Sequence, residues 1–248
     1  LMREHDCGAI PVVDDGVMID LSRMKGLSID AASGVARVEA GLTLGELVTA
    51  LGDHGLATTT GTCAGVGVSG STLGGGIGWL SGIYGMGIDN VLAFELVGAD
   101  GRTQRVSATS HPDLFWALRG GGGNFGIVTA IEYRVYPLHQ VLGGMLVYPL
   151  AEAAAPLRQY AQLLTTAPDE LGSLAVCATF PGVGPACLLQ FCYAGANLAK
   201  GESLLSSLRR DCRPTIDTIQ TRPYAEFFMA HTPPAPDGMH YYEANCAL

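Results

Sequence analysis

A single thiol lies in a segment that has few side chains. Residues 61–70 read GTCAGVGVSG, with Cys63 near the start. The glycines continue to Gly87, and eleven of the 27 residues from Gly61 to Gly87 are glycine. Because glycine has no Cβ, such a segment exposes backbone N–H groups and lets a ligand approach the main chain closely. The composition indicates a surface for a long, flat, anionic ligand such as a flavin dinucleotide.

Two other interpretations of this segment stay open on the residues alone. Gly65-Val-Gly67-Val-Ser-Gly70 matches G-x-G-x-x-G, the fingerprint of a nicotinamide-binding Rossmann fold. That fingerprint needs a buried strand before it and a helix after it. The preceding TTTGTCA does not read as a buried strand, and the glycines at 74–78 argue against a regular helix. Tight turns between strands are the other alternative, but they leave a second glycine cluster at 120–126 unexplained.

Composition narrows the class of protein. The 248 residues are 48% hydrophobic and 15% charged, which indicates a globular protein with a buried core. The net charge is −9 and no basic stripe occurs, so we expect no nucleic-acid partner. No apolar run reaches the roughly 18 residues that a membrane span needs, so we expect no membrane partner.

The cysteines and the two ends of the chain bear on location. Seven cysteines are scattered without a C-x-x-C pair, so we expect free thiols in a reducing, cytoplasmic compartment and no metal site. The sequence begins with Leu1 and ends within a strand-like YYEANCAL, so both ends look cut and an upstream secretion signal stays open.

Two differently built parts are expected to position the glycine segment. For residues 1–137 we predict strands at 17–21, 27–30, 34–41 and 127–136. We also predict a helix opened by a Thr43–Glu46 capping box, a hairpin around a two-residue Asp100-Gly101 turn, and a short helix at 112–118. For residues 138–248 we predict helices at 151–164 and 200–210 and strands at 173–180 and 186–193, an α+β pattern.

Two long stretches resemble a known family. GTCAGVGVSGSTLGGGIGWLSGIYGMGIDN and ADGRTQRVSATSHPDLFWALRGGGGNFGIVTAIEYRVYPL are similar to the flavin domain of the berberine bridge enzyme-like FAD-linked oxidases, within the PCMH-type, or vanillyl-alcohol oxidase, superfamily. The resemblance runs through nearly the whole chain and is most specific from Gly61 to Leu138. It implies an α+β fold: a PCMH-type FAD-binding domain at 1–137, with its N-terminal part missing. Part of an α/β substrate domain with an antiparallel sheet follows at 138–248, with its C-terminal part missing.

The resemblance also implies how the cofactor is held. Many members bind FAD covalently, through a cysteine sulfur on flavin C6 and a histidine nitrogen on the 8α-methyl group. The family's G-T-C-x-x-V-G loop matches Gly61 to Gly67, which places Cys63 at the cysteine position. His5 falls at the histidine position, although Arg3 and Glu4 replace the two glycines that usually precede it. The alternatives are an ordinary buried thiol at 63 and a surface histidine at 5.

Other positions carry over from the family motif. Val66 matches a position beside the flavin ring where small side chains go with oxygen access. The expected FAD contacts are Gly67, Gly70, Ser71, Gly74, Gly76 and Ile77 along the flavin, with Gly126 and Ile127 near the adenosine half. Tyr84 and Asn90 also fit the family pattern. No catalytic base can be assigned.

The sequence thus predicts an FAD-dependent oxidase. It would transfer hydride from an alcohol or amine carbon of a small molecule to covalently bound flavin, with O2 as acceptor and hydrogen peroxide as product. The alternatives are a truncated, non-catalytic flavin-binding remnant and a nicotinamide-dependent oxidoreductase. Substrate and oligomeric state are not readable from the residues.

Overall fold

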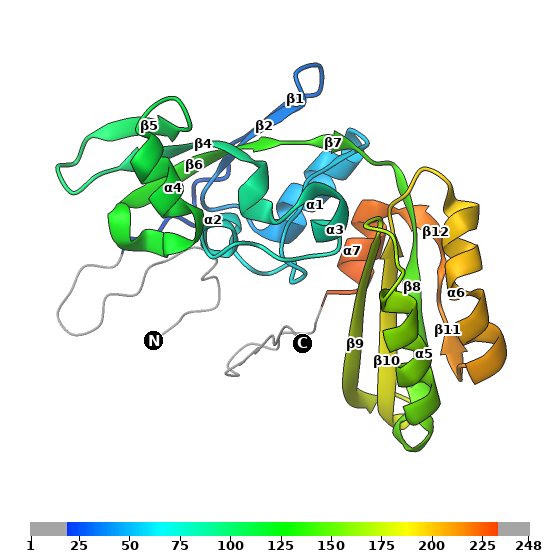
Figure 1. Ribbon diagram of the computed structural model, residues 1–248. Coiled ribbons are helices and arrows are strands. Elements are labelled where there is room, and N and C mark those ends of the chain that lie inside the picture. The colour runs from blue at the N-terminus through cyan, green and yellow to red at the C-terminus, as the bar shows by residue number, and fades with distance from the viewer. Residues whose placement is uncertain (1–18, 233–248) are drawn as a thin grey trace, which may run out of the picture.

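The computed structural model describes residues 19–232, and these form two antiparallel sheets with helices beside each (Figure 1). The first sheet has the order β1-β2-β6-β4-β5, made of Leu27–Asp30, Val35–Glu39, Ile127–Arg134, Val91–Val97 and Thr103–Ser107. A small two-stranded sheet pairs β3, Leu56–Ala57, with β7, Tyr136–Pro137. The second sheet has the order β11-β8-β10-β9, made of Ile216–Asp217, Gln140–Pro149, Gly184–Tyr193 and Leu171–Phe180, and β12, Gln220–Pro223, also pairs with β8. The predicted α+β class, with an antiparallel sheet in the second part, is confirmed.

Helices cover one face of each sheet. In the first part these are α1 Leu44–Asp53, α2 Val68–Leu73, α3 Ser81–Tyr84 and α4 Pro112–Gly121, with 3-10 turns η1 Gly87–Asn90 and η2 Gly122–Phe125. In the second part, η3 Leu150–Glu152 leads into α5 Ala154–Leu164, followed by α6 Leu198–Cys212 and α7 Tyr224–Ala230. Helices α5 and α6 lie on the same side of the second sheet in Figure 1, over a core that includes Tyr148, Leu189 and Phe191.

The capping box at the start of α1 is confirmed. The Thr43 hydroxyl accepts a hydrogen bond from the Glu46 N–H at 3.2 Å, and the Glu46 carboxylate accepts one from the Thr43 N–H at 2.7 Å. Two of the otherwise unpaired donors at the helix start are therefore satisfied within four residues of sequence. Leu44, Leu47 and Leu51 then face the core at helical spacing.

Three local predictions were wrong. The hairpin turn has three residues rather than two, because the Gly98 N–H pairs with the Arg102 C=O and Gly101 takes a positive φ of 74°. A short helix was missed: α2 begins at Val68, inside the G-x-G-x-x-G stretch, and packs against α4 and η2, whereas the glycines at 74–78 open no helix, as expected. The long strand expected at 127–136 ends at Arg134, and Tyr136 pairs instead with Ala57. Most of the strand expected at 17–21 cannot be compared, because residues 17 and 18 lie outside the described residues; Ile19 makes a single β-bridge.

The core of the first part is completed by a helix from the second part. Helix α7 packs against α1, and its Phe227 and Phe228 are fully buried in the same hydrophobic cluster as Leu47 and Val38. Trp79 packs edge-on against Phe227, with 5.2 Å between ring centroids. Figure 1 shows α7 between the two sheets. The two parts therefore share one buried interface.

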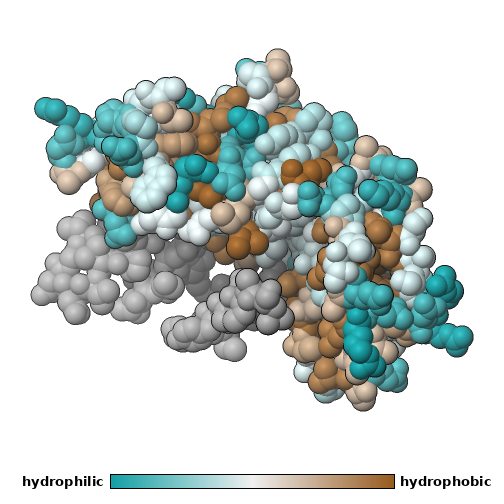
Figure 2. Space-filling view, in the orientation of Figure 1, coloured by the Kyte–Doolittle hydropathy of each residue, from teal (hydrophilic) through white to brown (hydrophobic). Residues whose placement is uncertain are grey.

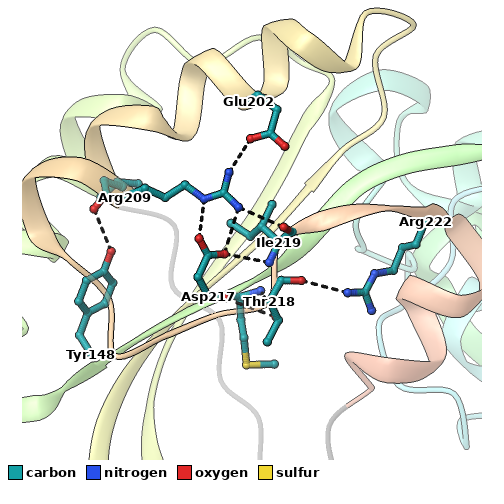
Figure 3. Close-up of polar contacts among 9 residues, drawn as sticks. Tyr148, Glu202, Arg209, Asp217, Thr218, Ile219 and Arg222 are labelled. Atoms are coloured by element: carbon teal, nitrogen blue, oxygen red, sulfur yellow. Dashed lines mark hydrogen bonds and ion pairs between the residues drawn. The ribbon is translucent and has the colours of Figure 1, made fainter.

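One arginine ties α6 to the edge of the second sheet (Figure 3). The Arg209 guanidinium makes a two-pronged ion pair with the Asp217 carboxylate, at 2.6 and 3.1 Å, and also contacts Glu202. The Arg209 Nη2 group also donates to the Ile219 C=O at 3.0 Å. The planar guanidinium is suited to this, because its donors lie in a fixed fork. Arg209 thus fixes the short break at residues 218–219 between β11 and β12, which both pair with β8 in the same direction.

Ion pairs cross the polar face of the first sheet. Arg105 on β5 pairs with Glu132 on β6 through two hydrogen bonds of 2.9 and 2.6 Å. Arg37 on β2 pairs with Glu95 on β4 at 2.9 Å. The neighbouring guanidinium lowers the pKa of Glu132, and the same is true of Glu95. Alternation of these charged side chains with buried apolar ones fixes which face of the sheet lies against the core.

The Glu132 ion pair predicts a pH-dependent stability. A carboxyl group whose pKa is lowered in the folded state stabilises above its ordinary pKa, and this contribution is lost as the pH falls through the lowered value. We expect Glu132→Gln to reduce the free energy of unfolding by about 0.5–1 kcal/mol at pH 7. The difference from the wild type should shrink as the pH falls below the ordinary glutamate pKa. Urea unfolding at several pH values measures this, with the exposed Glu152→Gln as control. A difference independent of pH would contradict the assignment.

Candidate functional site

The loop that carries Cys63 is held by the start of α1. The Leu44 N–H donates to the Val66 C=O at 2.9 Å, and the Gly45 N–H donates to the Ala64 C=O at 2.9 Å. In return, the Val68 N–H donates to the Leu42 C=O at 2.8 Å. The first N–H groups of a helix have no partner inside the helix. Here the loop supplies those partners, so its shape is fixed by the main chain.

A residue far along the chain closes the loop from the other side. The Thr232 hydroxyl accepts a hydrogen bond from the Ala64 N–H at 2.8 Å and donates to the Thr62 C=O at 3.1 Å. These two groups flank Cys63, which is half-buried and carries a free thiol. The preceding His231 is buried, and its Nδ1 donates to the Phe227 C=O at 2.8 Å. Burial lowers the pKa of His231. Helix α7 therefore anchors the clamp that Thr232 forms.

Two glycines of the loop and α2 are not required by the protein's own packing. A Cβ placed on Gly65 or Gly70 would meet no heavy atom within 4 Å, and neither residue has a positive φ. Gly70 lies inside α2, where glycine is about 0.8–1 kcal/mol less favourable than alanine. Both residues are exposed. The missing side chain of Gly70 leaves the backbone of α2 open to a ligand.

Other glycines of the segment are explained by the fold itself. A Cβ on Gly78 would lie 1.9 Å from the Thr60 carbonyl oxygen, and one on Gly126 would lie 2.5 Å from the Val97 carbonyl oxygen. Gly76 has φ 73° and its C=O accepts a hydrogen bond from the Gly87 N–H at 2.8 Å. The glycines of this segment therefore fall into two groups. Those that the packing requires are explained by the fold, and only those whose side-chain position is open point to a ligand.

Exposed apolar side chains border the open backbone. Val66 is 41% exposed and Ile77 is 66% exposed, on either side of α2 in the sequence. Figure 2 shows hydrophobic patches among pale, weakly polar surface in this part of the molecule. No acidic, basic or histidine residue occurs from Gly55 to Ile88. A ligand here would meet apolar side chains and backbone N–H groups rather than charges, which suits a flat ring joined to a hydrogen-bonding chain.

The segment after α3 is fixed by a buried amide. The Asn90 side chain donates to the Tyr84 and Met86 carbonyl oxygens at 3.0 and 2.9 Å and accepts from the Tyr136 hydroxyl at 2.9 Å. The Tyr84 and Tyr136 rings stack with centroids 3.9 Å apart. Burial raises the pKa of Tyr84. Asn90 and these two rings form a support for the glycine segment rather than an acid–base pair.

The structure brings most of the predicted FAD contacts into one region. Cys63, Val66 and Gly67 lie in the loop that leads into α2, and Gly70, Ser71, Gly74, Gly76 and Ile77 lie within or directly after α2. Gly126 and Ile127 follow η2, which contacts α2. His5 lies outside the described residues. Among residues 19–232 no cluster of histidine, cysteine or acidic side chains could hold a metal, and no helix is long and apolar enough to cross a membrane.

The Thr232 clamp was not predicted from the sequence. Thr232 lies about 170 residues from the loop it binds, and a threonine after a short helix carries no local signal for such a contact. Asn90 fits the family pattern, but its contacts were not predicted: two of its hydrogen bonds are local, to Tyr84 and Met86, and the third joins it to the distant Tyr136.

The clamp predicts a change in the reactivity of Cys63. We expect Thr232→Val to lower the free energy of unfolding by about 1–2 kcal/mol, because the Ala64 N–H and Thr62 C=O lose a partner. The freed loop should let a maleimide reagent label Cys63 faster in the flavin-free protein. Thr232→Ser keeps the hydroxyl and is the matched control. Equal labelling rates in all three proteins would contradict the clamp.

Comparison with known proteins relates the chain to FAD-linked oxidoreductases. Residues 4–107 match the model of the FAD binding domain. An FAD-linked oxidoreductase from Dictyostelium discoideum is 32% identical over 232 residues, which are 93% of this chain and 50% of that protein. The chain thus spans about half the length of the curated relatives it matches.

Two solved structures of oxidoreductases of this kind share the fold over most of the chain. A 6-hydroxy-D-nicotine oxidase from Arthrobacter nicotinovorans superposes with a TM-score of 0.78 at 32% identity, covering 84% of this chain and 46% of that one. A variant of berberine bridge enzyme superposes with a TM-score of 0.72 at 26% identity, covering 84% and 43%. The fold, the open glycine surface and these likenesses agree with the resemblance seen in the sequence: residues 4–107 match an FAD binding domain, and the chain is similar to FAD-linked oxidoreductases, berberine bridge enzyme among them.

Proposed function

We propose that the protein is an FAD-dependent oxidase that acts on an alcohol or amine carbon of a small molecule. Bound FAD supplies the hydride acceptor and passes the electrons to O2. The observation that carries the proposal is the exposed backbone at Gly70 in α2, which follows the loop that carries the half-buried thiol of Cys63. The match to the FAD binding domain supports the cofactor, and the oxidase names of similar proteins support the acceptor.

The residues of the loop and α2 fit such a cofactor. The exposed backbone at Gly70 would lie along its polar chain, and Val66 and Ile77 would lie against its apolar parts. The main-chain hydrogen bonds to α1 and the Thr232 clamp hold these groups in place without the ligand, so little ordering is needed on binding. Charge on the cofactor would be met by N–H dipoles, because the segment has no charged residue.

We also propose that the flavin is covalently attached, with Cys63 as one attachment point and His5 as the second. Cys63 is supported by its place in a loop that is rigid on both sides while its thiol is free and half-buried. For His5 the support is the sequence resemblance alone. Val66 is the residue we propose to govern oxygen access, since its side chain is small and exposed beside the loop.

Attachment predicts that the flavin stays with the polypeptide after acid precipitation. We expect the washed precipitate of the flavin-loaded protein to keep its flavin absorbance. Cys63→Ala should change the absorbance spectrum and, combined with His5→Ala, should release the flavin completely. Cys212→Ala, at a partly buried thiol on α6, is the control and should retain the flavin as the wild type does. A flavin-loaded wild type whose Cys63 is fully alkylated by a thiol reagent would overturn the attachment.

The open glycine predicts opposite effects on stability and on flavin binding. We expect Gly70→Ala to raise the free energy of unfolding of the flavin-free protein by about 0.5–1 kcal/mol, because alanine favours the helix. The same methyl group should weaken flavin binding, because it fills space that the proposed ligand occupies. Urea unfolding and flavin titration measure the two effects. Ser203→Ala, exposed within α6, is the matched control and should leave flavin binding unchanged. Undiminished flavin binding by Gly70→Ala would contradict the proposed site.

A further inference from the structure

Two cysteines face each other across the hairpin of the second sheet. Cys177 on β9 and Cys187 on β10 are direct partners in the antiparallel register, and both thiols are free. Directly opposed residues project their side chains to the same face of a sheet. Here that face is the one covered by α5 and α6, because the neighbouring Leu189 and Phe191 belong to the core beneath those helices.

The hydrogen-bond pattern places this pair where side chains come closest. The Ala194 N–H donates to the Glu170 C=O at 2.9 Å, one step beyond the pair Tyr193 and Leu171. Hydrogen-bonded and non-hydrogen-bonded pairs alternate along an antiparallel ladder. Ala194 and Glu170 form a hydrogen-bonded pair, and Cys187 lies an odd number of positions before Ala194 on β10. Cys187 and Cys177 therefore form a non-hydrogen-bonded pair. Cα atoms of such pairs lie about 4.5 Å apart, within the roughly 4.4–6.8 Å that a disulfide spans.

The two thiols differ in their access to solvent. Cys177 is exposed on β9, which is an edge strand of the sheet. Cys187 is fully buried, and burial, with Cys177 beside it, raises the pKa of its thiol to about 11. An oxidant from solvent therefore reaches Cys177 first, and Cys187 is the adjacent group that can react with it.

We propose that Cys177 and Cys187 form a peroxide-sensitive thiol pair that closes into a cross-strand disulfide. The Cys177 sulfur attacks hydrogen peroxide and becomes a sulfenic acid, and one water leaves. The Cys187 sulfur then attacks the Cys177 sulfur and expels the hydroxyl as a second water. Two thiol hydrogens and two electrons pass to the peroxide, and one S–S bond forms. A peroxide from any source suffices, so the pair does not depend on the proposed oxidase activity.

The disulfide would join β9, an edge strand of the described sheet that has no charged residue, to β10. Strand β9 reads LGSLAVCATF, and edges of this kind are open to pairing with other chains. The other described thiols lack such a partner in the register: Cys192 faces Gly172 and Gly143, and Cys212 lies at the end of α6. We therefore expect peroxide to join Cys177 to Cys187 in preference to any other pair of these thiols.

The test counts free thiols after exposure to hydrogen peroxide. No lysine or arginine lies between Arg158 and Lys200, so trypsin releases Cys177, Cys187 and Cys192 on one peptide. Alkylation of the unfolded, untreated protein should add three groups to that peptide. After peroxide we expect only one group to be added and two hydrogens to be lost, and a reductant should restore all three sites.

Two variants separate geometry from general reactivity. Cys177→Ser should take two alkyl groups with or without peroxide. Adding Ala178→Cys to that variant moves the thiol to the other face of β9, opposite Ala186, and it should take three groups after peroxide. Three groups on the treated wild type, closure in the relocated variant at the wild-type rate, or a sulfonic acid at Cys177 without loss of the Cys187 thiol would each overturn the proposal.

Discussion

The site depends on one exchange of main-chain hydrogen bonds. Helix α1 begins with N–H groups that have no partner inside the helix, and the carbonyl groups of the Cys63 loop accept two of them. Gly45 makes the approach possible, since a Cβ there would lie 3.0 Å from the Ala64 Cβ. The loop is thereby fixed by its main chain, and among its side chains that of Ala64 is buried in the core. A rigid loop with an open outer surface is what lets so few side chains define a binding site.

This arrangement separates two roles of glycine that the sequence shows as one pattern. At Gly78 and Gly126 the absent Cβ makes room for a neighbouring carbonyl oxygen, so the protein needs glycine in order to fold. At Gly70 the absent Cβ makes room for no other atom of residues 19–232, and helix propensity disfavours glycine there. Residues that oppose local stability without helping the packing are expected at functional sites. Composition alone could not distinguish these cases, because the difference lies in what surrounds each backbone position.

Local sequence patterns predicted most of the helices and strands, whereas features that depend on long-range contacts were not predicted. The Thr43–Glu46 capping box, the helices at 154–164 and 198–212 and the paired strands of the second sheet follow from short-range signals. The residues that the family motif predicts as cofactor contacts lie mostly within α2 and the segments next to it. The helix α2 itself was missed, because its packing against α4 outweighs glycine's low propensity. The Thr232 clamp was beyond local reasoning, because no pattern links residues about 170 positions apart.

The return of α7 to the first sheet has a consequence for how the chain is made. Phe227 and Phe228 complete a core that begins with Ala36 and Val38, so the ribosome must release nearly all of the described chain before that core can close. Until then Leu47 and its neighbours on α1 lack their covering layer. Exposed apolar surface on a nascent chain is where chaperones bind and where aggregation starts. During synthesis the core of the first part therefore stays incomplete until α7 has been made and packs against α1.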